Sequence, residues 1–319
     1  MLGTREAYGE ALVEVGQINE DVVVLDADLS GSTRTSKFAG EFPDRFFNMG
    51  VSEQDMLATA AGLAASGKIP FASTFAIFAA GRAWEVIRQS ICYPQHNVRI
   101  VASHGGITVG PDGASHQCTE DIALMRVLPN MSVIIPADAH EAKGAIRFAI
   151  QHQGPLYIRM ARDKFPVLYD SNYRFELGRA QVHRRGNDAT IIAIGLMIYE
   201  AQQAIDLLEE KGLQVGLINM SSIKPLDREA IVEAARSSGA IVTAEEHSII
   251  GGLGSAVSEV LGEEYPVPLK RVGVKDVFGT SGKPKDLIVH YGLTAQDIVR
   301  AVEDAIQLKP TERPVSAAK

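Results

Sequence analysis

The feature that most restricts the fold of this chain is a regular alternation between short apolar runs and longer amphipathic segments. Six runs in the first half are rich in β-branched residues and apolar on both faces, as parallel strands covered by helices are. Segments with helical spacing separate them, and several of these segments end at glycine, a common helix stop. The alternation predicts a doubly wound α/β domain over residues 1–165. The six predicted strands cover 22–28, 45–50, 69–74, 98–103, 132–138 and 155–161.

A second alternation predicts a smaller α/β domain over residues 188–308, where runs such as ATIIAIG, QVGLINM and AIVTAEE alternate with helical segments. Residues 166–187 mix aromatics, Pro, Asn and Gly without a sustained period, so we expect an ordered linker. We expect its basic pair, Arg184 and Arg185, to be solvated. Residues 309–319 are polar and contain proline, which predicts a flexible tail. The expected fold class is therefore α/β, with two doubly wound domains.

Charge and composition narrow the classes of function. The 31 Lys and Arg residues are outnumbered by 39 Asp and Glu residues, for a formal net charge of −8. This balance disfavours nucleic acid and anionic membrane surfaces as partners, since both would be repelled. No apolar run reaches the roughly 18 residues of a spanning helix, and we expect no signal peptide in the charged N-terminus. Cys92 and Cys118 lack C-x-x-C spacing and are expected to be free thiols in a reducing cytoplasm.

Ligands of open parallel sheets bind at the carboxyl ends of the strands, so the residues there are candidates for function. Asp28 and Ser32 follow the first predicted strand in a short polar loop, where both also serve as ordinary turn and cap residues. Glu53 follows the second strand at the start of a helix that Ser52 is placed to cap. The helix dipole favours a glutamate there, and the same carboxyl group could accept a proton in a pocket.

Aromatic and basic residues follow other strands. Phe75 and Phe78 stand three residues apart after the third strand, a spacing typical of core packing but also suited to stacking on a flat heterocycle. Arg162 ends the sixth strand, and Arg5 lies near the N-terminus. Arginine suits bidentate phosphate binding, although both residues could be surface charges.

The segment with the most candidate residues is VASHGGITVGPDGASHQCTED, residues 101–121. His104 and His116 flank a glycine-rich loop that contains Asp112, directly after an apolar strand. The glycines allow the backbone to wrap around a ligand. A twelve-residue histidine spacing without a nearby cysteine or third histidine gives weak support to a metal site. We therefore expect polar, proton-exchanging contacts with hydroxyl groups.

A glycine-rich string at 251–257, GGLGSAV, resembles part of a dinucleotide fingerprint. Val257 replaces the third glycine, and no acidic residue closes a following strand at the right distance. We therefore interpret the string as packing at a helix start, which disfavours a nicotinamide dehydrogenase.

The order of the motifs resembles a known family. GTRE, ADLSGS, GVSEQDM, STFAIF, SHGGITVGPDGASHQ and ARDKFP resemble the pyrimidine-binding domain of transketolases. AEEHSIIGGLGSAV and GTSGKPKDLIVHYGLTAQDI resemble the C-terminal domain of the same family. The resemblance covers residues 3–305 and implies an enzyme that depends on thiamine diphosphate.

The resemblance also implies roles for the residues that would meet this cofactor. Glu53 matches the glutamate that hydrogen-bonds the aminopyrimidine ring and so promotes cofactor activation. Phe75 and Phe78 match the aromatics that pack this ring; a third aromatic is frequent in the family where this chain has Gly81. Asp28 matches an aspartate near the cofactor at the subunit interface.

Other matched residues are implied to bind the sugar. His104 and His116 match histidines that contact the substrate, and Asp112 matches the aspartate that reads a hydroxyl group. The resemblance implies a shared role for four polar residues in holding the terminal phosphate of a sugar phosphate: Arg5, Ser32, His104 and Arg162.

One family motif is absent from this chain. Transketolases hold the diphosphate through Mg²⁺ at a Gly-Asp-Gly segment, and the sequence contains none. The resemblance therefore implies the C-terminal subunit of a split transketolase. An N-terminal subunit would supply the diphosphate-binding and Mg²⁺-binding residues, in an α₂β₂ heterotetramer. Because the sequence starts at Met1 in front of GTREAYGEAL, we expect a natural subunit.

The implied reaction transfers a two-carbon ketol unit from a ketose phosphate to an aldose phosphate, as in the pentose phosphate pathway. Two alternatives stay open. One is a deoxyxylulose-phosphate-synthase-like or 2-oxo-acid dehydrogenase beta-type subunit, which would use a 2-oxo acid donor. The other is a non-catalytic module of the same fold.

Overall fold

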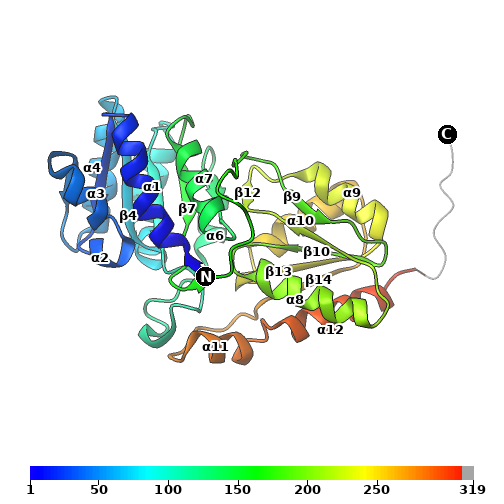
Figure 1. Cartoon of the computed structure of the whole chain (residues 1–319). Helices are drawn as coiled ribbons and strands as arrows, with labels where there is room; N and C mark the ends of the chain where they lie inside the picture. Colours follow the sequence, from blue (N-terminus) through cyan, green and yellow to red (C-terminus); the bar gives the residue numbers. More distant parts are fainter. Residues whose placement is uncertain (311–319) are drawn as a thin grey trace, which may run out of the picture.

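The computed structural model describes residues 1–310, which form two α/β lobes joined side by side (Figure 1). The predicted flexible tail, 309–319, lies outside the described residues from 311 onward. A two-stranded antiparallel ribbon, β1 (Leu2–Gly3) with β8 (Lys164–Phe165), ties the start of the chain to the end of the first lobe. Within the described part of the chain, no helix is long and apolar enough to cross a membrane.

The first lobe is built on a seven-stranded sheet with the order β12-β6-β7-β5-β4-β2-β3. Six strands come from the first half of the chain and run parallel to one another. The seventh, β12, is antiparallel to β6 and comes from the second half. The strands are β2 (Val22–Asp26), β3 (Phe46–Asn48), β4 (Ile69–Phe75), β5 (Arg99–Ser103), β6 (Ser132–Ile134), β7 (Leu156–Arg159) and β12 (Ser222–Lys224).

Helices cover both faces of this sheet, which keeps its central strands buried on two sides. On one face α1 lies beside α7, and Leu12 and Ile146 share a core cluster with Val24 of β2. On the other face, Met56 of α4 and Ile87 belong to a second cluster. The helices are α1 (Thr4–Ile18), α2 (Ser30–Thr33), α3 (Ser36–Glu41), α4 (Glu53–Ala65), a broken helix over Phe78–Arg82, α5 (Trp84–Val86) and Ile87–Cys92, then α6 (Asp121–Arg126) and α7 (Ala139–Ala149).

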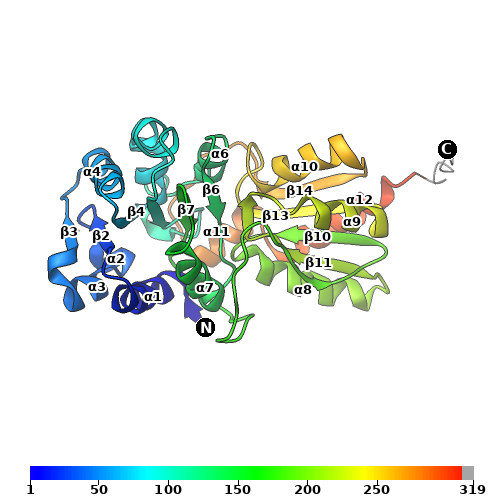
Figure 2. The same ribbon diagram turned by 90° about the horizontal axis from the view of Figure 1, so that it is seen from above.

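The second lobe has a five-stranded sheet with the order β14-β13-β10-β11-β9 (Figure 2). Its strands are parallel except β9, which pairs antiparallel with β11 at one edge. The strands are β9 (Gln181–Arg184), β10 (Ala189–Ala193), β11 (Val215–Asn219), β13 (Ile241–Ser248) and β14 (Leu269–Val274). The helices are α8 (Met197–Glu210), α9 (Arg228–Ser238), α10 (Leu253–Glu264), α11 (Pro284–His290) and α12 (Ala295–Gln307).

The start of α10 explains the glycine-rich string at 251–257. The buried Glu245 carboxylate accepts hydrogen bonds from the amides of Leu253 and Gly254, at 2.7 and 2.8 Å. A Cβ on Gly252 would lie 2.0 Å from Oε2 of Glu245. The glycines therefore allow a carboxylate to sit against the helix start, as the packing interpretation requires.

The predicted fold class, α/β with two doubly wound domains, is confirmed, but several details differ. Residues 45–50 were expected to form a buried strand, whereas β3 is an edge strand with Phe47 and Asn48 exposed. It pairs with β2 on one side, so its apolar residues lack the second neighbour of a central strand. The segment expected as a linker, 166–187, contains β9.

The expected solvated pair makes exposed ion pairs: Arg184 with Glu209, and Arg185 with Glu233. Both cysteines are free, as expected from their spacing, and both are buried.

Candidate functional site

The predicted ring-binding residues and loop histidines meet at the carboxyl ends of β4 and β5. Phe75 and Phe78 lie with their rings nearly parallel, 5.8 Å between centroids and 11° between planes. His104 stacks on Phe75 with a centroid distance of 3.8 Å. His116 packs edge-on against both phenylalanines, at 6.2 and 5.6 Å. Four side chains from two separate segments therefore form one cluster, called the aromatic–histidine cluster below.

His104 is a buried member of this cluster, 2% exposed. Its backbone has φ of 62°, and its Nδ1 lies 2.8 Å from the hydroxyl of Ser103. Burial lowers the pKa of His104 to about 3, and the nearby charges of Arg5 and Arg162 add to the effect. The ring is therefore neutral near pH 7, with one donor and one acceptor nitrogen. It can hydrogen-bond a hydroxyl or a phosphate oxygen, but it adds no positive charge.

Glu53 begins α4 and is 2% exposed. Arg82 places Nη1 2.8 Å from Oε2 of this carboxylate. The same guanidinium lies 5.0 Å from the centroid of the Phe78 ring, within the range of a cation–π contact. Arg82 thus links Glu53 to the aromatic–histidine cluster. The expected cap is wrong, because the Ser52 side chain makes no capping hydrogen bond, although Ser52 is the N-cap residue.

Three arginines from separate segments act electrostatically on His104: Arg5, Arg34 and Arg162. Nη1 of Arg5 donates to the carbonyl of Ser32 at 3.0 Å. Arg162 donates to the carbonyl of Val109 and lies 3.4 Å from Oδ1 of Asp112. Burial lowers the pKa of Arg5, Glu6 opposes this shift, and Arg34 and Arg162 add to it. The structure therefore brings together the predicted phosphate-binding residues, with Asp112 beside them.

A buried aspartate fixes the loop that carries Ser32. Asp26 accepts hydrogen bonds from the hydroxyls of Thr33 and Thr35, at 2.6 and 2.8 Å, and from the amide of Leu29 at 2.6 Å. Burial raises the pKa of Asp26, an effect that these hydrogen bonds oppose. Asp26 thus holds the backbone that Arg5 contacts.

Asp28 lies apart from the cluster. Its carboxylate is exposed and accepts a hydrogen bond from Asn48 at 3.1 Å, on the β3 side of the sheet. Gly81, where the family often has a third aromatic, is also exposed, and a Cβ there would meet only Ile77 at 3.6 Å. The edge of the ring-binding surface at Gly81 is therefore open.

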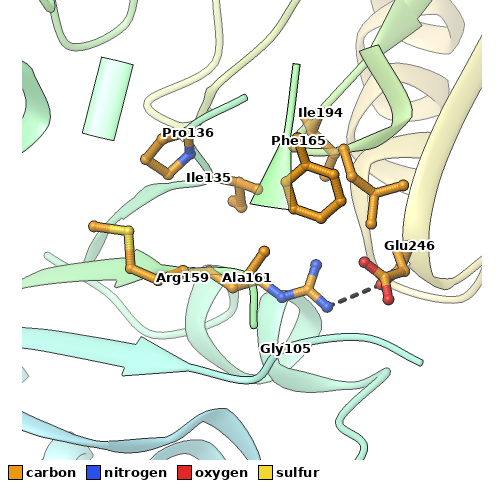
Figure 3. Close-up of a pocket in the computed structure, with 11 residues that line it drawn as sticks. Gly105, Ile135, Pro136, Arg159, Ala161, Phe165, Ile194 and Glu246 are labelled. Carbon is orange, nitrogen blue, oxygen red and sulfur yellow. Dashed lines mark hydrogen bonds between the residues drawn. The ribbon is translucent and has the colours of Figure 1, made fainter. Parts of the chain in front are cut away.

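Sequence reasoning missed Arg82 and two charged residues at the junction between the lobes. Arg82 follows Phe78 by four residues, the spacing that places two side chains on one helix face. Arg159 and Glu246 stand in the apolar strands β7 and β13 and are buried. In the sequence, the signal for both residues was a charged side chain within an otherwise apolar strand. They line a cavity of about 20 Å³, room for about one water molecule (Figure 3).

The cluster has the features that a flat nitrogen heterocycle would need. The two phenylalanines offer an apolar face, and Glu53 offers a water-poor carboxylate that could hydrogen-bond a ring nitrogen. Among residues 1–310, no group of three or more His, Cys, Asp or Glu side chains is arranged to hold a metal ion. The residues present thus fit the pyrimidine portion of thiamine diphosphate.

Comparison with known proteins supports the resemblance seen in the motifs. Residues 1–167 match the transketolase pyrimidine-binding domain, and residues 178–298 match the transketolase C-terminal domain. A Methanocaldococcus jannaschii protein, provisionally named transketolase C-terminal section, is 49% identical, with 96% of each chain covered. A 6-deoxy-6-sulfo-D-fructose transketolase subunit of Clostridium sp. strain MSTE9 is 41% identical, with 96% of this chain and 95% of the relative covered.

A solved structure agrees with these relatives. It is described as a split gene transketolase in an inactive β4 tetramer, and it is 56% identical to this chain with a TM-score of 0.92. The match covers 97% of this chain and 100% of the other. The motif resemblance is thereby confirmed. With both domains matched in this order, the chain belongs to the transketolase family, as a counterpart of the C-terminal subunit of split transketolases.

Proposed function

We propose that this chain is the C-terminal subunit of a thiamine-diphosphate-dependent transketolase. With an N-terminal subunit, it would transfer a two-carbon ketol unit from a ketose phosphate to an aldose phosphate. The observation that carries the proposal is a continuous series of contacts that starts at Glu53 and passes through Arg82 to Phe78. From Phe78 it reaches His116 directly and His104 through Phe75. This series joins the residues assigned to the cofactor with those assigned to the sugar.

On the cofactor side, bound thiamine diphosphate would supply a carbon nucleophile that attacks the donor carbonyl. Glu53 would hydrogen-bond the pyrimidine ring, while Phe75 and Phe78 pack against it. A hydrogen bond to a buried carboxylate is stronger than the same bond in water. Arg82 pairs with the Glu53 carboxylate, which offsets part of the cost of burying it. We assign Asp28, exposed near β3, to the interface with another subunit.

On the substrate side, neutral His104 and half-buried His116 would hydrogen-bond sugar hydroxyls, and Asp112 would accept from one of them. Arg5 and Arg162 would hold the terminal phosphate, for which the planar guanidinium is well suited. Ser32 fixes Arg5 through its carbonyl. Binding a phosphate remote from the reacting carbon supplies energy that can orient the reacting end.

The remaining parts of the site are assigned to the partner. We propose that the N-terminal subunit holds the diphosphate and Mg²⁺, and that two copies of each chain assemble as α₂β₂. The structural relative is described as inactive as a β4 tetramer, which is the behaviour that a shared site would give to the present chain without its partner.

The test is to purify the chain alone and with a candidate N-terminal subunit. Each preparation is assayed with xylulose 5-phosphate and ribose 5-phosphate in the presence of thiamine diphosphate and Mg²⁺. We expect turnover only from the pair. Substantial turnover by the isolated chain would contradict the shared site. Turnover of pyruvate with carbon dioxide release, in place of the ketose phosphate, would instead favour the 2-oxo acid alternative.

A further inference from the structure

The glycine-rich loop of residues 105–118 is anchored at its base by the second lobe. Within the loop, the amide of Gly106 donates to the carbonyl of Cys118 at 2.7 Å, which closes it. Just beyond the loop, the amide of Ser248 in β13 donates to the carbonyl of Thr119 at 2.8 Å. The end of β13 therefore runs beside the closed base of the loop.

Glu246 of β13 reaches into this loop. Its Oε1 accepts a hydrogen bond from the amide of Thr108 at 2.5 Å. A Cβ on Gly106, which has φ of +82°, would lie 2.3 to 2.4 Å from the carboxyl carbon and Oε1 of Glu246. A glycine is thus required where the carboxylate enters. From the other side, Arg159 donates to the Glu246 carbonyl at 2.9 Å (Figure 3).

A second contact holds the far part of the loop. Nε2 of Gln117 donates to the carbonyls of Ile107 and Thr280, both at 2.9 Å. A Cβ on Gly113 would lie 2.5 Å from the hydroxyl of Ser281. Figure 1 shows α11, which follows this segment, below the first lobe. The loop is therefore enclosed by β13 on one side and by residues 280–284 on the other.

The outer part of the same loop carries Asp112 and His116, two of the residues assigned above to the sugar. We propose that Glu246 is a positioning residue for substrate binding: by holding the amide of Thr108, it sets the loop so that Asp112 and His116 face the sugar. This inference rests on the proposed function and gives the C-terminal domain a part in forming the substrate site.

The first test uses the isolated chain and does not depend on activity. Glu246→Asp keeps the negative charge beside Arg159 but withdraws the carboxylate by one methylene from Thr108. Hydrogen–deuterium exchange at the amide of Thr108 should become about tenfold faster or more, since a buried hydrogen bond is lost. Glu246→Gln keeps the length and an acceptor oxygen, so it should restore most of the protection.

A matched control lies at the same junction. Glu259 of α10 is exposed and pairs with Arg126 across the two lobes, at 2.6 and 3.1 Å. Its carboxylate therefore contacts Arg126 and not the glycine-rich loop. Glu259→Asp makes the same chemical change and should leave the exchange of Thr108 unaltered.

The second test uses the assembled enzyme. Glu246→Asp should raise KM for the ketose phosphate by about tenfold with a smaller change in kcat, and Glu246→Gln should recover most of it. If Glu246→Asp does not fold, Gly106→Ala serves instead, because its Cβ displaces the same carboxylate from the loop side and should give the same two effects. Unchanged Thr108 exchange, or an unchanged KM in a folded variant, would overturn the proposal. An inactive wild-type pair would reject the proposed function, while the exchange data would still decide whether Glu246 holds the loop.

Discussion

Two ion pairs in the first lobe show how differently a buried carboxylate can be used. Glu53 is 2% exposed, but its partner Arg82 is 50% exposed and lies over an aromatic ring. Asp121 and Arg159, at the junction of the lobes, are 0% and 6% exposed and lie 3.1 Å apart. The first pair has an open side where a ligand can approach. The second is enclosed and also bonded to the backbone, as a structural pair is.

The largest expected effect is a loss of activity, which should follow a change in the Glu53–Arg82 pair. In the assembled enzyme, Glu53→Gln should lower kcat by about 10²- to 10⁴-fold, because the amide cannot take part in proton sharing with the cofactor. Circular dichroism and the thermal midpoint of the variant should match those of the wild type. Near-normal turnover would reject Glu53 as the activating group.

The enclosed pair should instead control stability. Replacing Arg159 by Met leaves Asp121 buried without its cation, so the free energy of unfolding should fall by about 3–5 kcal/mol. Urea denaturation of the isolated chain measures this change. Arg126→Met is the matched control, because the Arg126–Glu259 pair crosses the same junction at the surface and should cost no more than about 1 kcal/mol. Equal losses in the two variants would remove the distinction between enclosed and open pairs.

The stability of the folded chain should also respond to acid, through the buried His104 ring. The pKa of His104 is lowered from 6.5 to about 3, mainly by burial. In the folded chain the ring therefore stays neutral at pH values at which the unfolded chain protonates it. The stabilisation is therefore present above pH 6.5 and is lost as the pH falls toward 3.

Between pH 7 and pH 5, the wild type should lose about 2 kcal/mol more unfolding free energy than His104→Asn. Urea denaturation at the two pH values gives the difference directly. Parallel pH profiles for the two proteins would show that His104 is not the buried neutral ring described above.

The smallest effect is expected from the exposed partner of the open pair. Arg82→Gln should lower the free energy of unfolding by only about 1 kcal/mol, because the glutamine amide can still donate a hydrogen bond to the buried Glu53 carboxylate and solvent reaches the Arg82 side of the pair. Activity of the assembled enzyme should fall far more than stability, since Glu53 would lose the guanidinium that holds its carboxylate beside the Phe78 ring. A stability loss as large as that of Arg159→Met would mean that the two pairs play the same structural role.

The sequence predicted the parts of the molecule that follow from local pattern. Alternating apolar runs and helical segments predicted both sheets, because a buried parallel strand is apolar along its length whichever strand it pairs with. β12 was missed, since three residues of SIK carry no periodicity and join the first sheet from the second half of the chain. β3 was predicted as buried because its apolar residues do not reveal that it lies at an edge.

The same limit applies to the candidate site. Strand ends identified His104, Phe75 and Glu53, and the structure brings these residues into one neighbourhood. Arg82 and Glu246 were not identified, because their partners are chosen by tertiary contacts with segments far along the chain. Glu246, for example, binds the amide of Thr108, 138 residues away.

The most direct measurement is calorimetric titration of thiamine diphosphate with Mg²⁺ into the chain, into the proposed N-terminal subunit and into the two together, followed by turnover assays on the same samples. Tight binding coupled to turnover should occur only when both polypeptides are present, and Glu53→Gln should keep the assembly while abolishing turnover. Full binding and turnover by this chain alone would contradict a site completed across two subunits.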